Sequence, residues 1–295
     1  MSYASELINS ERQNISLLLQ VALSGIISTM QNNRSSARAM RLTFLGTGTS
    51  MGIPMIGCSC AVCSSSDPSN QRLRTSALLE YEGLSILFDA GPDLRQQALR
   101  VGLKRLDAVL LTHAHADHIS GIDDLRPLNF AQHSSIPLYG TADVLADVRQ
   151  RFAYAFSELQ SESTRPVLDL VTITHQQPFQ LGELIFLPLA VQHGSQTITG
   201  FRCGSLGYIT DASALCDSTR AALHGLDVLV LNALRTKPHP THFSIAQALE
   251  LIAELHPQRA FLVHMGHEVD HASTNAQLPP HVRLAFDGLS ISSEW

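Results

Sequence analysis

The sequence lacks the features of several large classes of protein. Its most apolar N-terminal stretch, residues 15–30, is interrupted by polar side chains and is shorter than the roughly 20 apolar residues that a bilayer-spanning helix needs. No basic segment precedes it, so we expect no secretory signal and no membrane association, and the sequence favours the cytoplasm. The five cysteines are an odd number, and three fall within six positions. This bunching favours metal or thiol chemistry over a disulfide framework.

Charged side chains are scarce, and they carry no positive excess. Only 16% of the 295 residues are charged, 44% are hydrophobic, and the formal net charge is −6. This balance is typical of a globular protein and excludes wholesale disorder. A net negative chain offers no long-range attraction for a polyanion, so long nucleic acid is disfavoured as the main ligand unless a bound metal supplies positive charge.

Residues 40–295 contain no linker or repeat, which predicts a single domain. Residues 1–39 are predicted to be an N-terminal extension, either a short helix or the product of an upstream start.

Short apolar runs predict strands over 41–45, 77–81, 85–88, 108–111, 167–174, 184–189, 208–210, 227–231 and 260–263. Helical spacing predicts helices over 92–101, 142–152, 213–223 and 245–255, and candidate caps for the last three are Thr141, Asp211 or Ser213, and Ser244. Because strands far outnumber helices, a layered α/β sandwich is favoured over a doubly wound sheet.

The densest cluster of potential metal ligands follows the strand predicted over 108–111. His113, His115, Asp117 and His118 occupy four of six consecutive positions. Side chains at i and i+2 of an extended backbone lie on one side, so His113 and His115 can share one ion, while the other two face a second. Such ligands suit Zn²⁺, Mn²⁺ or Fe²⁺. The alternative is a run of solvated histidines.

This His-x-His-x-Asp-His sequence resembles the signature of the metallo-β-lactamase superfamily. Four further parts of that pattern follow in the family's order, at Asp89, His193, Asp211 and His264. The resemblance covers residues 40–295 and implies a four-layer αββα sandwich with two catalytic divalent metals, Zn or Mn, along one edge. It implies that one ion is held by His113, His115 and His193, and the other by Asp117, His118 and His264, with Asp211 bridging them.

The resemblance also implies a metal-dependent hydrolase. A hydroxide bridging the two ions would be the nucleophile, and Asp117 would orient it or accept its proton. Two divalent ions and two carboxylates give a formal charge of about +2, which favours phosphate anions as substrates.

A second cluster lies on a glycine-punctuated loop. Cys58, Cys60 and Cys63 supply three thiols, and tetrahedral zinc needs a fourth ligand. His267, three residues after His264, is the natural candidate, and such a site would hold one structural Zn. Free buried cysteines or an adventitious disulfide are the alternative. Cys203 and Cys216 are expected to be core residues.

The Cys-x-Cys-x-x-Cys loop, together with a histidine shortly after His264, resembles the phosphodiesterases of the carbon–phosphorus lyase pathway and their relatives. That family hydrolyses small cyclic phosphates of ribose and other phosphodiesters, with manganese or zinc at the di-metal site and zinc at the cysteine site. The resemblance implies that His242 approaches the phosphate and stabilises or protonates the leaving oxygen. An exposed loop histidine is the alternative, and His239 and His271 are weaker candidates for the same role. A homodimer is compatible with the family.

Other functions on this fold remain open. The tRNA 3′-processing endonuclease shares the metal ligands, but its long arm lies between the lone histidine and the bridging aspartate, where this chain has only 17 residues between His193 and Asp211. Thioester or lactam hydrolysis is a further alternative, as is a non-catalytic binding protein. The sequence therefore predicts a metal-dependent phosphodiesterase for small cyclic phosphates or short nucleotide phosphodiesters.

Overall fold

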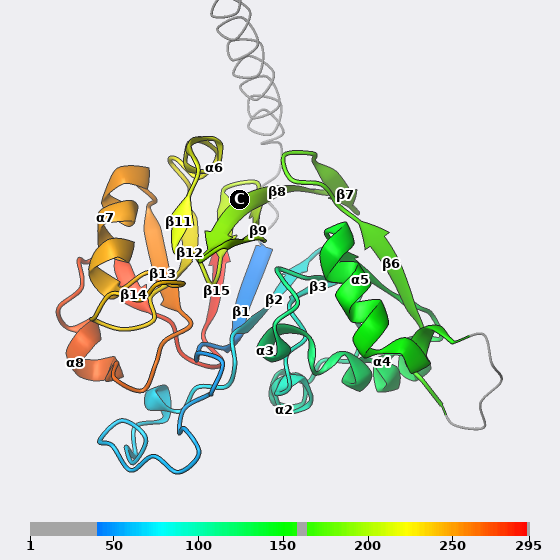
Figure 1. The fold of residues 1–295 in the computed structure, drawn as a ribbon, viewed down its shortest axis with the longest axis horizontal. Coiled ribbons are helices and arrows are strands. Elements are labelled where there is room, and N and C mark those ends of the chain that lie inside the picture. The colour runs from blue at the N-terminus through cyan, green and yellow to red at the C-terminus, as the bar shows by residue number, and fades with distance from the viewer. Residues whose placement is uncertain (1–39, 158–163, 294–295) are drawn as a thin grey trace, which may run out of the picture. The chain divides into compact units, whose positions relative to one another are not determined.

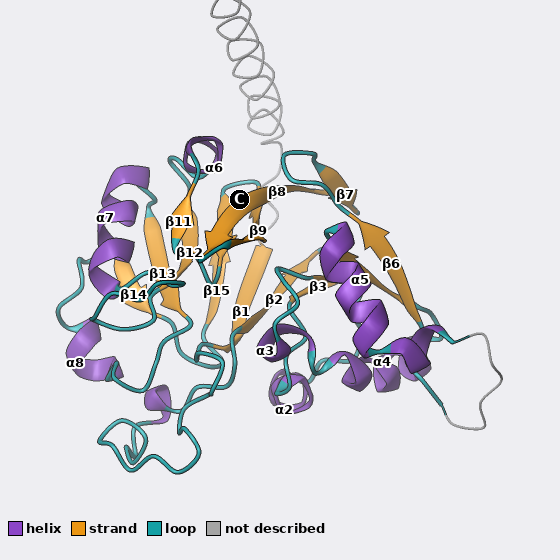
Figure 2. Cartoon of the chain, viewed as in Figure 1, coloured by secondary structure: helices purple, strands orange, loops and turns teal. Residues whose placement is uncertain are grey.

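The computed structural model describes residues 40–157 and 164–293. Two β-sheets pack against each other, and helices cover their outer faces (Figures 1 and 2). This arrangement confirms the predicted αββα sandwich. The N-terminal extension predicted over residues 1–39 lies outside the described part. Within the described ranges, no helix combines the length and the apolar character that crossing a bilayer requires.

In the part of the chain that the structure describes, the first sheet has seven strands in the order β15-β1-β2-β3-β4-β5-β6. The strands from β3 to β6 run parallel, and the others pair antiparallel. Their bounds are β1 Met40–Gly46, β2 Ser76–Tyr81, β3 Leu84–Phe88, β4 Ala108–Leu110, β5 Ile136–Gly140, β6 Leu168–Thr172 and β15 Ser290–Ser293. The helical segments that follow these strands are α2 Leu94–Val101, α3 Ala116–Ile119, α4 Arg126–Gln132 and α5 Ala142–Arg151, together with short 3-10 turns at Pro68–Asn70, Ile122–Leu125 and Ala153–Phe156.

The second sheet has the order β11-β8-β9-β10-β12-β13-β14, and β7 pairs with β8 beside this path. Its strands are β7 Phe179–Leu181, β8 Leu184–His193, β9 Gln196–Cys203, β10 Leu206–Ile209, β11 Ala214–Leu215, β12 Val228–Asn232, β13 Arg259–Val263 and β14 Val282–Leu284. The helices of this half are α6 Asp217–Ala222, α7 Ile245–Leu255 and α8 His271–Asn275.

Aromatic side chains fill the space between the sheets. Phe88 of β3 stacks on Tyr208 of β10 with ring centroids 4.3 Å apart, and Phe201 of β9 lies 5.8 Å from Phe88. Strand side chains alternate between faces. Ile86 and Phe88 therefore enter this inner core, whereas Leu87 packs into the outer core beneath the helices. The sandwich thus has a core between the sheets and a further core on each outer face.

Helix α7 confirms the prediction of a helix over residues 245–255. The Ser244 hydroxyl accepts a hydrogen bond from the backbone N–H of Gln247, and the Gln247 side chain accepts one from the backbone N–H of Ser244. This reciprocal capping satisfies two N–H groups that the helix leaves unpaired. The apolar face is buried through Ile245, Ala248, Leu251, Ile252 and Leu255.

The prediction of a helix over residues 213–223 is wrong for the first half of that range. Ala214 and Leu215 form strand β11, which pairs with β8, and α6 begins after Cys216. Neither Asp211 nor Ser213 caps it, because Cys216 occupies the N-cap position, and the Ser213 hydroxyl donates to the carbonyl oxygen of Gln192 instead. Cys216 is exposed, against the expected core position, whereas Cys203 is buried. Strands β5 and β9 were not predicted, because Pro137 and an irregular polar pattern mask them.

Candidate metal centre

Strands from both sheets end at one edge, and a histidine or aspartate stands at or just beyond each of these ends. Asp89 follows β3, Asp211 follows β10 and His264 follows β13. All three have positive φ angles, of 60°, 58° and 58°. Few residues other than glycine adopt this left-handed conformation, and strained backbone of this kind clusters at functional sites.

His113, His115 and His193 form one group of donors. His113 Nε2 lies 2.9 Å from His115 Nδ1, and the ring centroid of His193 is 5.1 Å from that of His115. The carbonyl oxygen of Thr241 accepts the His193 Nδ1 hydrogen at 2.7 Å, which leaves Nε2 of His193 with a free lone pair. One donor atom from each histidine lies within 4.8 Å of the others. This spacing suits a single ion.

Asp117, His118, Asp211 and His264 form the second group. His118 Nε2 lies 3.2 Å from Asp117 Oδ2 and 3.5 Å from Asp211 Oδ1. His264 Nε2 lies 3.2 Å from Asp211 Oδ2, and the same oxygen is 3.9 Å from His113 Nε2 of the first group. Asp211 therefore stands between the two groups.

Orphaned polar atoms show that the second group fits a cation. His118 and His264 are 0% and 1% exposed, and the Nε2 atoms of both are buried without a hydrogen-bond partner among the described residues. A buried polar group left unsatisfied costs about 1–3 kcal/mol. Imidazole and carboxylate donors at these separations would be satisfied together by divalent ions such as zinc or manganese.

The ionisation of the second group follows from its mutual contacts. Burial raises the pKa of Asp211, but the opposing charges of His264 and His118 outweigh it and hold that pKa well below its usual range. Burial likewise raises the pKa of Asp117, but the close, opposing charges of His118 and His264 lower it overall. Both carboxylates are therefore anionic at neutral pH, the form that binds metal.

Asp89 lies behind the second group and contacts it through His118. Its Oδ2 accepts hydrogen bonds from His118 Nδ1 at 2.7 Å and from the Thr112 hydroxyl at 2.8 Å, and its Oδ1 accepts from the Thr112 backbone N–H. Because the Thr112 hydroxyl donates to Asp89, it accepts from His113 Nδ1, 3.0 Å away. One carboxylate thus sets the orientation of two histidines. The sequence pattern included Asp89 but gave it no role.

His242 lies on the loop before α7, at the boundary of both groups. Its ring centroid is 4.8 Å from those of His193 and His264, and its buried Nδ1 has no hydrogen-bond partner within residues 40–157 and 164–293. Burial and the neighbouring His264 lower its pKa to about 3, so it is neutral at physiological pH. His239 is nearby, but its Nδ1 accepts hydrogen bonds from Thr241. His271 packs against Phe286 instead.

The three predicted cysteines converge on His267. Its Nδ1 lies 3.2 Å from Sγ of Cys58, 3.6 Å from Cys60 and 3.8 Å from Cys63. Around tetrahedral zinc, sulfur and nitrogen ligands stand about 3.5 Å apart, given bonds of about 2.3 and 2.0 Å. The backbone N–H of Cys63 donates to Cys60 Sγ and lowers its pKa to about 6, which favours the thiolate. The residues therefore fit one zinc ion.

Buried Arg72 ties the cysteine loop to the loop that carries His264 and His267. Its guanidinium donates to the carbonyl oxygens of Gly266 at 3.3 Å and Val269 at 2.8 Å. The backbone of Arg72 also pairs with that of Ile53, just before the cysteines. The cysteine site and the second metal group therefore share a single anchored loop.

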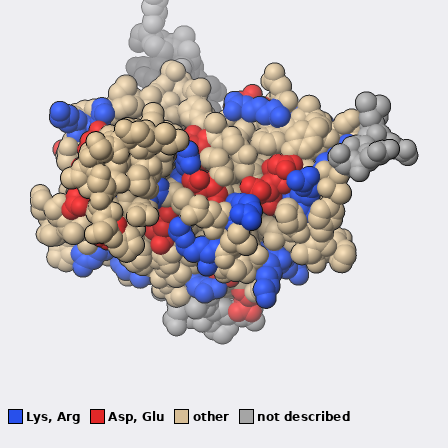
Figure 3. Space-filling model, turned by 90° about the horizontal axis from the view of Figure 1, so that it is seen from below, with Lys and Arg blue, Asp and Glu red and all other residues tan. Residues whose placement is uncertain are grey.

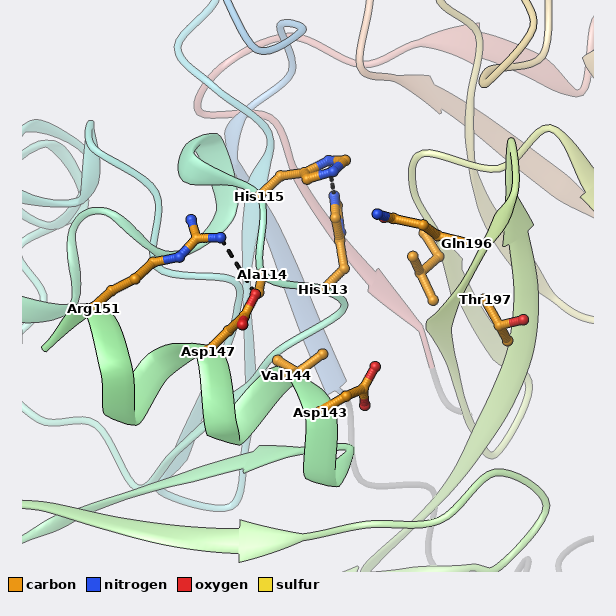
Figure 4. A pocket seen from close by; sticks show the side chains of 10 residues that line it. His113, Ala114, His115, Asp143, Val144, Asp147, Arg151, Gln196 and Thr197 are labelled. Carbon is orange, nitrogen blue, oxygen red and sulfur yellow. Dashed lines mark hydrogen bonds and ion pairs between the residues drawn. The ribbon is translucent and has the colours of Figure 1, made fainter. Parts of the chain in front are cut away.

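A pocket of about 450 Å³ opens beside His113 and His115 (Figure 4). Its other polar lining comes from Asp143, Asp147 and Arg151 of α5, and from Gln196 and Thr197 where β9 begins. No sequence pattern indicated that these residues belong to the site. The spacing of i, i+4 and i+8 places the three α5 side chains on one helix face, but no sequence signal sets that face beside His115.

The family model for a beta-lactamase superfamily domain matches residues 85–265. Together with the fold and the two donor groups, this match shows that the chain belongs to the metallo-β-lactamase superfamily. The predicted family is thereby confirmed, as is the predicted class of metal-dependent hydrolases.

One solved structure within this superfamily is similar over nearly its full length. It is described as a new diphosphatase from the PhnP family, with 41% sequence identity and a TM-score of 0.81 over 86% of this chain and 97% of that one. This similarity confirms the predicted resemblance to the phosphodiesterases of the carbon–phosphorus lyase pathway and their relatives.

Two curated relatives carry other names. An octanoyltransferase of Porphyromonas gingivalis is 39% identical over 253 residues, which are 85% of this chain and 51% of that protein. A ribonuclease Z of Methanopyrus kandleri is 27% identical over 168 residues, which are 55% of this chain and 49% of that protein. This chain thus spans about half the length of the curated relatives it matches.

Proposed function

We propose that this chain is a metal-dependent phosphodiesterase that hydrolyses small cyclic phosphates or short nucleotide phosphodiesters. The observation that carries the proposal is the placement of Asp211 between two groups of histidine and carboxylate donors, with His242 beside both. The similar diphosphatase of the PhnP family supports phosphate chemistry at such a site.

The proposed ligands of one ion are His113, His115 and His193, and those of the other are Asp117, His118 and His264, with Asp211 shared. When bound, two divalent ions would offset the negative charge of the phosphate and lower the pKa of an attacking water. Thr112 and Asp89 keep His113 and His118 in the tautomers that present Nε2 to the site. The preorganised imidazoles and anionic carboxylates are what this chain contributes to metal binding.

His242 is proposed to act on the phosphate directly. Its low pKa leaves it neutral, so it acts as a hydrogen-bond donor toward a phosphate or leaving oxygen rather than as a cation. Asp117 is the carboxylate proposed to accept a proton from the attacking water, because it is anionic and partly accessible. Positioned donors and acceptors of this kind contribute about 10²- to 10⁴-fold to rate.

The Cys58, Cys60, Cys63 and His267 set is proposed to hold a structural zinc. All four positions of a tetrahedral site would be filled by protein ligands, which is the pattern of structural rather than catalytic zinc. Through the loop from His264 to Val269, this zinc would stabilise one edge of the catalytic site.

Ribonuclease activity is the second candidate, because a ribonuclease Z is among the relatives. Strands β8 and β9 are joined at residues 194 and 195, and β9 leads into β10 without a protruding segment. The face in Figure 3 shows lysine and arginine interspersed with acidic residues rather than a continuous basic surface. These features favour a small substrate. The name octanoyltransferase belongs to a protein about twice as long and does not assign an activity to the matched half.

A bis(p-nitrophenyl) phosphate assay with elemental analysis tests the proposal. We expect about three metal ions per chain and activity that chelation removes and Mn²⁺ or Zn²⁺ restores. The Asp211→Ala variant should be folded and inactive, and Glu250→Ala, on the exposed side of α7, is the matched control. Near-native turnover in Asp211→Ala would contradict the mechanism. A metal-loaded protein that is inert toward phosphodiesters would contradict the function.

A further inference from the structure

A buried asparagine ends the strand that lies between the two strands leading to Asp211 and His264. In the second sheet β12 is placed between β10 and β13, and the two proposed metal ligands follow these neighbours. Asn232 is the last residue of β12 and is 0% exposed. Because Asp211 Oδ2 and His264 Nε2 are 3.2 Å apart, the two ligands meet across the end of this middle strand.

The side chain of Asn232 continues the sheet where the backbone pairing of β10 stops. Strands β10 and β12 pair in parallel as far as Ile209 and Leu231. Beyond this point Asn232 Oδ1 accepts a hydrogen bond from the backbone N–H of Ala212 at 2.7 Å, and Asn232 Nδ2 donates to the carbonyl oxygen of Ala212 at 3.0 Å. One side-chain amide therefore binds both backbone groups of the residue after Asp211, as a neighbouring strand would.

Asp211 needs such support because its backbone is strained. Its φ angle of 58° is in the left-handed region, where a residue other than glycine persists only if the surrounding structure fixes it. Both hydrogen bonds of Asn232 reach the next residue, so they fix the peptide on the C-terminal side of Asp211. Without them this peptide can rotate toward an ordinary conformation, and the Asp211 carboxylate then leaves its place between the two groups of donors.

The same carbonyl oxygen connects Asp211 to His242. The carbonyl oxygen of Ala212 also accepts a hydrogen bond from the backbone N–H of Phe243 at 2.7 Å, and Phe243 directly follows His242. A displaced Ala212 would therefore move the His242 loop as well. Because both polar atoms of the Asn232 side chain bind Ala212, the residue acts on the site through Ala212 rather than as a ligand of a metal or a phosphate.

We propose that Asn232 is a positioning residue, which sets Asp211 between the two groups of proposed metal ligands and His242 beside both by holding the backbone of Ala212. The proposal rests on the proposed phosphodiesterase function. A leucine at position 232 would have a similar shape and would fill the same space, but it would leave the N–H of Ala212 without this acceptor. Asn232→Leu therefore separates the role of the hydrogen bonds from that of packing.

Asn129 provides a matched control. It is 5% exposed, its Oδ1 accepts a hydrogen bond from the backbone N–H of Val167 at 3.0 Å, and its Nδ2 donates to the carbonyl oxygens of Val167 and Ser134, each at 2.9 Å. A buried amide again binds both backbone groups of one residue, but Asn129 lies on α4 and Val167 precedes β6. Asn129→Leu should therefore lower the Tm as Asn232→Leu does, without changing the metal centre.

Metal titration and electron paramagnetic resonance of the Mn²⁺-loaded protein give readouts that do not depend on turnover. Two Mn²⁺ ions that share a carboxylate are magnetically coupled, and their spectrum differs from that of separate ions. In Asn232→Leu the affinity for the catalytic ions should fall about 10- to 100-fold, as is usual for a lost supporting contact. The coupled spectrum should give way to that of separate ions.

At saturating metal, kcat of Asn232→Leu for bis(p-nitrophenyl) phosphate should fall about 10²-fold, because small misplacements of catalytic groups have effects of this size. Asn129→Leu should keep the metal affinity, the spectrum and the kcat of the wild type. If Asn232→Leu does not fold, the smaller side chains of Asn232→Ala and Asn129→Ala allow the same comparison.

Equal metal affinity, spectra and kcat in the Asn232 and Asn129 variants would overturn the proposal and leave the phosphodiesterase in place. A wild-type protein without magnetic coupling would also overturn it, because Asp211 would then not be shared. If the metal-loaded wild type hydrolysed no phosphodiester, the proposed function would fail, whereas the titration and the spectra would still decide whether Asn232 positions Asp211.

Discussion

The carbonyl oxygen of Thr241 accepts a hydrogen bond from Nδ1 of His193 at 2.7 Å, although 48 residues separate them in the chain. The loop that carries His242 is therefore attached directly to a proposed metal ligand. Because the acceptor is a backbone atom, a side-chain substitution at residue 242 leaves this hydrogen bond intact. The contribution of His242 can thus be measured without disturbing His193.

We expect His242→Ala to leave the metal content unchanged and to lower kcat by about 10²- to 10⁴-fold. This range is typical of a lost hydrogen-bonding or proton-transfer group. Steady-state kinetics with a phosphodiester and elemental analysis check this. His281→Ala, at an exposed position before β14, is the control. Since the pKa of His242 is about 3, the acid side of the pH–rate profile near neutrality should not change on substitution. Wild-type kcat in His242→Ala would reduce His242 to a loop residue.

Asp89→Asn should weaken metal binding without removing a ligand. An amide at this position donates as well as accepts, so it no longer fixes the His118 tautomer that presents Nε2. Loss of such a supporting contact typically costs about 10- to 100-fold in metal affinity. Metal titration of the stripped protein measures it, and activity should recover at high metal concentration. An unaltered affinity would show that His118 is oriented by its packing alone.

Removal of the cysteine site should lower stability while leaving the two catalytic ions bound. If free zinc exceeds its Kd 100-fold, binding contributes about 2.7 kcal/mol, and each kcal/mol shifts the Tm by about 2–4 °C in a chain of this size. His267→Ala should therefore bind one metal fewer and melt about 5–11 °C lower. Loss of all metal with no change in Tm would contradict the division into catalytic and structural sites.

The stability of the zinc-free protein should depend on pH through Cys60. The pKa of this thiol is lowered from 9.0 to about 6 in the folded chain by the N–H of Cys63, so its thiolate is favoured by folding. This stabilisation is fully present above pH 9 and is lost as the pH falls toward 6. The Tm difference between wild type and Cys60→Ser, both stripped of metal, should shrink over that interval. A constant difference would show that the thiol stays neutral.

Local sequence patterns were sufficient to predict several helices and strands but not others. Helix α7 could be predicted to the residue because its capping residues and apolar spacing are local. Strand β11 could not, because Ala214 and Leu215 are extended only through their pairing with Gln192 and Val191 of β8. Similarly, β9 is held between β8 and β10, and its own residues do not alternate regularly between polar and apolar.

The sequence by itself determined the chemistry available to this protein. The histidines and aspartates at strand ends, and the three cysteines on one loop, are ligand types whose spacing indicates metal binding whatever the surrounding fold. Only the tertiary structure decided which residues lie next to these ligands. It brought His267 to the cysteines across about 200 residues, set Asp89 behind His118 and placed the α5 carboxylates beside His115. Such contacts depend on how two sheets and their helices pack, and no local sequence pattern encodes that packing.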